Sequence, residues 1–68
     1  MKSVARITEI SAMSDKSFED AARIGITRAN KTLENVTGAW IQDQKIDVEK
    51  GKIKGFRVTM KVTFILKD

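Results

Sequence analysis

The strongest constraint on the fold is an alternating segment near the end of the chain. Every second residue from 56 to 66 is apolar: Phe56, Val58, Met60, Val62, Phe64 and Leu66. The residues between them are polar until Ile65 breaks the series. Because successive side chains of a strand point to opposite faces of the sheet, this period predicts a strand that packs on a core with one face only. We therefore expect a sheet that is covered on one side.

Two weaker patterns predict the other strands. Residues 4–11 form the expected first strand and residues 39–48 the expected second. Strict alternation in the second strand would place Trp40 on the same face as Gln44 and Ile46. Such a mixed face suits a binding surface or a polar subunit contact as well as the edge of a core. Residues 48–53 then predict a turn, in which Gly51 is free to take a positive φ.

Residues 17–34 change to a helical period. Small and apolar side chains recur along one stripe of this segment, at Phe18, Ala22, Gly25, Ala29 and Leu33. Ser17 and Asp20 stand three residues apart, as in a capping box at the start of a helix. A glycine inside a helix costs about 1 kcal/mol relative to alanine, and a close approach of the helix to the sheet would offset that cost.

The order strand, helix, strand, strand predicts the α+β class. We expect one domain over residues 1–68, in which a three-stranded antiparallel sheet wraps one helix.

A chain of 68 residues buries only about 60% of its unfolded surface, so its core is marginal. Small domains gain stability from disulfides, metals or association, and this chain has neither cysteine nor histidine. The uncovered sheet face would carry lysine, arginine, threonine and glutamine, so we expect association through polar contacts.

The same composition limits the chemistry of the chain. Without histidine and cysteine it lacks the commonest general base, a thiolate nucleophile and any Cys/His metal site, so we expect no enzyme. No apolar run approaches the length of a membrane span, and Arg6 and Glu9 interrupt the first apolar residues. We therefore expect a cytoplasmic protein that makes no membrane contact.

The net charge of +4 lies entirely in residues 45–68, which hold seven basic and three acidic side chains. A basic segment of this kind indicates either a solvated strand face or an anionic partner. Lys54, Gly55 and Phe56 match the opening of the main RNA-recognition strand motif. Val58 and Met60, however, stand where that motif has its stacking aromatics. A basic nucleic-acid-binding domain is therefore only a remote alternative.

Several segments match one family in their order and spacing. They are residues 4–10, the serine-containing segment 14–18, Ala21 with Ala22, residues 28–33 and, most strongly, residues 56–66. In these segments the chain resembles the dodecins, small proteins that assemble as hollow dodecamers and bind flavins or related ligands. The resemblance covers essentially the whole chain, and it implies a hollow homododecamer.

The resemblance also points to two positions in a flavin site. In flavin-binding dodecins a tryptophan at the start of the second strand stacks on the isoalloxazine, and a glutamine early in the third strand hydrogen-bonds it. Those positions fall on Gly38 and Arg57, while Trp40 lies two residues further along. Arginine at the second position resembles the calcium-binding branch of the family, in which Asp43 and Gln44 match an acidic and an amide position.

The resemblance thus implies a non-enzymatic shell that binds, stores or sequesters a small ligand or ion, with a calcium-type cation favoured. Calcium takes carboxylate and amide oxygens, and a symmetry axis multiplies each carboxylate by the number of copies around it. The candidate cation ligands are Asp43 and Asp47, with Asp68 as a third. The alternative ligand is riboflavin, FMN or coenzyme A, the last held by basic residues that include Lys61. The candidate ligand-binding residues are Gly38, Trp40, Gln44, Lys45 and Arg57.

Overall fold

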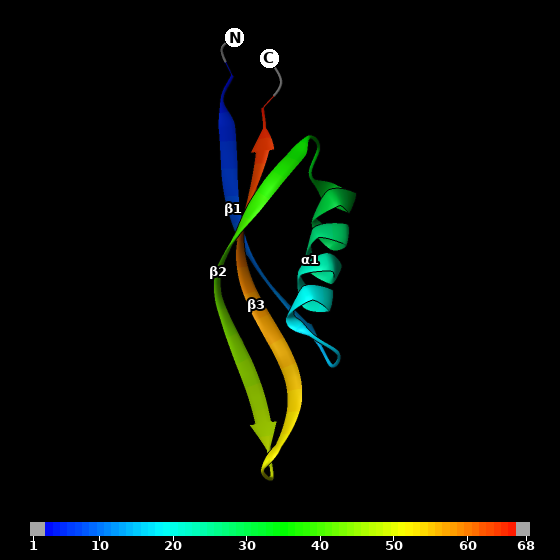
Figure 1. Ribbon diagram of the computed structural model, residues 1–68. Helices are drawn as coiled ribbons and strands as arrows, with labels where there is room; N and C mark the ends of the chain where they lie inside the picture. The colour runs from blue at the N-terminus through cyan, green and yellow to red at the C-terminus, as the bar shows by residue number, and fades with distance from the viewer. Residues whose placement is uncertain (1–2, 67–68) are drawn as a thin grey trace.

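Four elements follow one another along the chain in the computed structural model, which describes residues 3–66. They are strand β1 (Ala5–Ser14), helix α1 (Phe18–Thr32), strand β2 (Val36–Glu49) and strand β3 (Lys52–Ile65). The strands form one antiparallel sheet in the order β1-β3-β2, and α1 lies along one face of it (Figure 1). The predicted α+β class and the strand-helix-strand-strand order are therefore confirmed. None of the described residues belongs to a helix long and apolar enough to cross a membrane.

Strand β3 lies in the middle of the sheet, and its alternation builds the core. Val58, Met60 and Val62 are its most deeply buried side chains. They pack with Ala12 of β1 and Ala21 of α1, and half-buried apolar residues surround this cluster. The period of two in the sequence therefore predicted the covered face of β3 correctly.

Helix α1 approaches the sheet through small residues. Its buried residues are Ala21, Gly25 and Ala29, which succeed one another every four positions. The predicted stripe passed through Ala22, but Ala21 is the fully buried alanine and Ala22 is half-buried. At the start of the helix, the ring of Phe18 meets that of Phe56 edge to face, with 5.2 Å between ring centroids.

Serine side chains fix the connection between β1 and α1. The Ser17 hydroxyl caps the helix by accepting a hydrogen bond from the Asp20 backbone N–H at 3.0 Å. The Asp20 carboxylate in turn accepts a hydrogen bond from the buried Ser14 hydroxyl at 2.6 Å. The capping residue therefore acts as predicted, and the acidic partner ties the helix to the last residue of β1.

The turn between β2 and β3 has two residues, Lys50 and Gly51, between the paired residues Glu49 and Lys52. Their φ angles are 52° and 77°, and a type I′ hairpin turn requires both to be positive. A turn within the predicted segment 48–53 and the role of Gly51 are thus confirmed, but the turn is shorter than predicted because residues 48–49 and 52–53 pair as strands.

The molecule is elongated and leaves much apolar surface uncovered. It measures 51 × 19 × 13 Å, and its radius of gyration of 14.0 Å exceeds the ~11 Å expected for a compact domain of this length. Its accessible surface is 5382 Å², against about 4,300 Å² for a monomer of its mass. The β2–β3 hairpin extends past the start of α1 (Figure 1). Apolar residues on this hairpin, such as Val48 and Ile53, are exposed.

Candidate ligand-binding face

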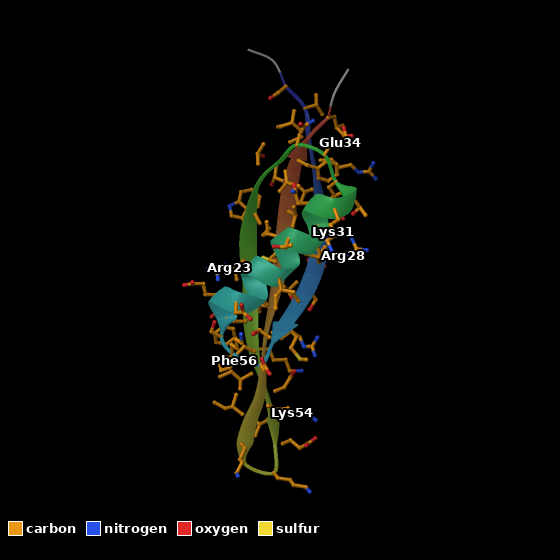
Figure 2. All side chains as sticks on the ribbon, turned by 90° about the vertical axis from the view of Figure 1, so that its right-hand side faces the viewer. Arg23, Arg28, Lys31, Glu34, Lys54 and Phe56 are labelled. Carbon is orange, nitrogen blue, oxygen red and sulfur yellow. The ribbon has the colours of Figure 1, made fainter. Side chains whose placement is uncertain are left out.

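The sheet face that points away from α1, here called the open face, carries most of the predicted site residues. Residues that pair across antiparallel strands share a face, and the odd-numbered residues of β3 from Arg57 to Thr63 point away from the core. The pairs between β2 and β3 on this face are Gly38 with Thr63, Trp40 with Lys61, Asp43 with Thr59, and Lys45 with Arg57. Figure 2 views the molecule from the helix side, so the open face lies behind the sheet.

A β-bulge decides which side chains of β2 reach the open face. The register shifts between Ile41 and Asp43, which leaves Gln42 without a partner in β3. An inserted residue reverses the alternation beyond it, so Trp40 lies on the open face while Gln44 pairs with Val58 on the helix side. Ile46 likewise pairs with Phe56 on the helix side. The expectation that Trp40, Gln44 and Ile46 share a face is wrong, because strict alternation does not allow for a bulge.

Trp40 is the most exposed aromatic side chain of the described residues, with 66% of its surface accessible. Its partner across the strands is Lys61, which in turn pairs with Glu9 of β1. One row of the open face therefore presents an indole, an ammonium and a carboxylate side by side. An exposed aromatic ring next to a cation can stack on a flat ring system and attract negative charge.

Arg57 is at the centre of a second row. Its Nη2 donates to Oδ2 of Asp47 in β2 at 3.2 Å and to Sδ of Met13 in β1 at 3.5 Å. The side chain of Arg57 is 42% exposed and that of Asp47 is 26% exposed. The structure thus brings Arg57, Lys45 and Asp47 together on the open face. Met13 was missed by the sequence analysis, because its position beside Arg57 depends on the pairing of β1 with β3.

The candidate cation ligands do not form a cluster within one copy of the chain. Asp43 and Asp47 both lie on the open face, in β2, and Asp47 is ion-paired with Arg57. Among residues 3–66, no group of three or more acidic side chains gathers as a metal site. Asp68, the third candidate, lies outside the described residues. Calcium usually takes six to eight oxygen ligands, so a calcium site would need carboxylates from several copies.

Two apolar grooves flank α1 on the other side of the sheet. One, of about 470 Å³, runs between α1 and β1 past Ile10, Ile24 and Leu33. The other, of about 410 Å³, runs between α1 and β2 past Ile26, Ile41 and Gly38. Of the predicted site residues only Gly38 borders a groove, and the charged ones, Asp43, Lys45, Asp47 and Arg57, lie on the opposite side of the sheet.

The comparisons with known proteins agree on one family. The Dodecin family model matches residues 4–67. The dodecin of Streptomyces davaonensis is 32% identical, with 100% of both chains covered and a TM-score of 0.95. The dodecin of Streptomyces coelicolor is 26% identical over 97% of this chain and 94% of its own, with a TM-score of 0.92.

A third similar structure is the calcium dodecin of Mycobacterium tuberculosis, described as a calcium-chelating immunodominant antigen with a novel calcium-binding site. It is 28% identical, 94% of this chain and 91% of its own are covered, and the TM-score is 0.82. No functionally curated protein matches the chain.

Proposed function

This chain belongs to the dodecin family, and from that premise we propose that it forms a homododecameric shell that binds a flat aromatic ligand of the flavin class without catalysing a reaction on it. The open face lines the interior of the shell, and the helices form its outer wall. The ligand is stored or sequestered inside.

The surface of the single chain supports assembly. It exposes roughly 1,100 Å² more than a compact monomer of its mass, the difference between 5382 Å² and about 4,300 Å². Large apolar side chains such as Ile24 and Ile41 are exposed beside the grooves that flank α1. Contacts between copies would cover these grooves, whereas the open face has enough polar and charged groups to remain wet.

The observation that carries the ligand assignment is the position of Trp40 on the open face. Its indole stands opposite Lys61, two residues along the strand from Gly38, where flavin-binding dodecins have their stacking tryptophan. A Cβ at Gly38 would find no described atom within 4 Å, so the place of the usual tryptophan is open. The ligand ring stacks on Trp40, and Lys61 attracts its electron-rich oxygens.

The direct test is a titration of riboflavin with the assembled protein, in which flavin fluorescence reports stacking. We expect saturable quenching with the wild-type protein and with Trp40→Phe. Stacking of a ring on an aromatic side chain contributes about 1–3 kcal/mol, so Trp40→Ala should weaken binding at least five-fold. Val48→Ala, an exposed apolar change on the hairpin, is the matched control. Unchanged affinity in Trp40→Ala would contradict the assignment.

Calcium is the second candidate, favoured by the similarity to the M. tuberculosis calcium dodecin. Asp43 lies on the open face opposite Thr59, where copies around a symmetry axis could bring several carboxylates together. Calorimetry of chelator-treated protein with Ca²⁺ separates the two candidates. Saturable heat that disappears in Asp43→Ala, together with no quenching of riboflavin, would replace the flavin proposal. Coenzyme A, whose adenine could also stack on Trp40, is tested by competition with riboflavin.

A further inference from the structure

Side chains from both neighbouring strands hold Arg57 in place on the open face. The hydrogen bonds from its Nη2 to Asp47 and to Met13 come from opposite sides, so the guanidinium is held between β2 and β1. Gly55 makes room for this arrangement, because a Cβ there would lie 3.1 Å from the Met13 Sδ. Two contacts within the chain therefore orient the guanidinium before any ligand binds.

Asp47 also sets the net charge of the group formed by Lys45, Arg57 and Asp47, here called the Arg57 row. Lys45 pairs directly with Arg57, and like charges directly opposite each other repel. Asp47 pairs with Gly55, two residues before Arg57 in β3. Its carboxylate therefore reaches Arg57 diagonally across the two strands. The two cations and one carboxylate together give the row a charge of +1, and removal of the Asp47 charge would double it.

We propose that Asp47 is a specificity-determining residue, which holds Arg57 and lowers the affinity of the open face for phosphorylated ligands relative to their unphosphorylated forms. The inference rests on the proposed function, because it concerns the ligand that stacks on Trp40. A phosphate group is best bound by two parallel N–H donors of an arginine. Asp47 already engages one Nη of Arg57 and repels a phosphate dianion. Riboflavin lacks the phosphate, so its binding does not need the guanidinium to be free.

The test compares riboflavin with FMN, two probes that share the ring system and differ by one phosphate. The ratio of their dissociation constants is measured by fluorescence titration at low salt for the wild type, Asp47→Asn and Asp47→Glu. Loss of one negative charge several ångströms from a phosphate should shift the ratio toward FMN about five-fold in Asp47→Asn. Asp47→Glu keeps the charge and should leave the ratio within about two-fold of the wild type. Native mass spectrometry verifies that all variants assemble alike.

A second background shows whether Asp47 acts through Arg57. In Arg57→Gln the guanidinium is absent, so adding Asp47→Asn should change the ratio by less than half of its effect in the wild type. An unchanged ratio in Asp47→Asn would overturn the inference. An effect that persists in full without Arg57 would also overturn it, because Asp47 would then act only as a distant charge.

Inorganic phosphate separates this inference from the proposed function. Calorimetry should show tighter phosphate binding in Asp47→Asn than in the wild type, whether or not flavins bind. If phosphate affinity rises while neither protein binds riboflavin, the role of Asp47 stands and the flavin proposal fails. If riboflavin binds and neither the flavin ratio nor phosphate affinity responds to Asp47→Asn, the flavin proposal stands and the role of Asp47 is wrong.

Discussion

The terminal methyl group of Met60 occupies the space that a side chain at Gly25 would need. A Cβ at position 25 would lie 2.5 Å from the Met60 Cε and 3.1 Å from the Ala12 Cβ. Met60 is 1% exposed but borders the groove between α1 and β2, so its terminal methyl can turn aside more easily than the Ala12 Cβ, which is fixed to its strand. The absence of a side chain at Gly25 therefore sets how closely α1 approaches β1 and β3.

We expect Gly25→Ala to destabilise the protein. Alanine gains about 1 kcal/mol over glycine in a helix, while overpacking a core costs about 1–3 kcal/mol. The free energy of unfolding should therefore fall by about 1 kcal/mol, as measured by urea denaturation at fixed protein concentration. The matched control is Gly38→Ala, where the added methyl meets no described atom within 4 Å. A gain in stability for Gly25→Ala would show that the core can yield at this contact.

Replacement of Ser17 by alanine should remove the helix cap. The Asp20 backbone N–H would lose its hydrogen-bond acceptor, and such caps contribute about 1 kcal/mol. The expected result is a fall of that size in the free energy of unfolding, again by urea denaturation. Ser11→Ala, on the exposed side of β1, is the control and should have no comparable effect. Equal stabilities of the two variants would argue against the cap.

The β2–β3 turn should tolerate only substitutions by residues that readily adopt a positive φ. Gly51 has a φ of 77°, which costs an L-residue about 1 kcal/mol, so Gly51→Ala should lower the melting temperature. Lys50→Asn should raise it, because Asn-Gly is the preferred sequence for a type I′ turn. Thermal unfolding followed by circular dichroism measures both changes. If both variants melt like the wild type, the turn does not contribute to the stability of the assembled protein.

Assembly should make the thermal stability depend on concentration. A folded state held together by contacts between copies is stabilised by mass action, so the melting temperature should rise with total protein concentration. Light scattering of the same samples should give twelve times the monomer mass. A melting temperature that stays constant over a hundred-fold dilution, together with a monomeric mass, would rule out the shell.

Local periodicity was enough to predict the elements and the covered face. The alternation around Val58 and the helical stripe around Gly25 are properties of short segments. In each segment the period of the apolar residues alone shows which face can pack on a core. Gln44 marks where this reasoning failed. The face of the sheet on which Gln44 lies depends on the bulge at Gln42. That bulge arises from the pairing of β2 with β3, and a prediction based on strict alternation does not include it.

Short-range patterns in the sequence were sufficient to predict an α+β chain whose sheet is covered on one face, because the period of the apolar side chains sets which of them can be buried together. The chemistry of the open face depends instead on contacts between strands that are distant in the sequence. Met13, Asp47 and Arg57 belong to three strands, and Trp40 reaches the same face only because the bulge directs it there. The pairing register between distant segments sets these neighbours, and that register depends on the packing of the whole sheet against α1.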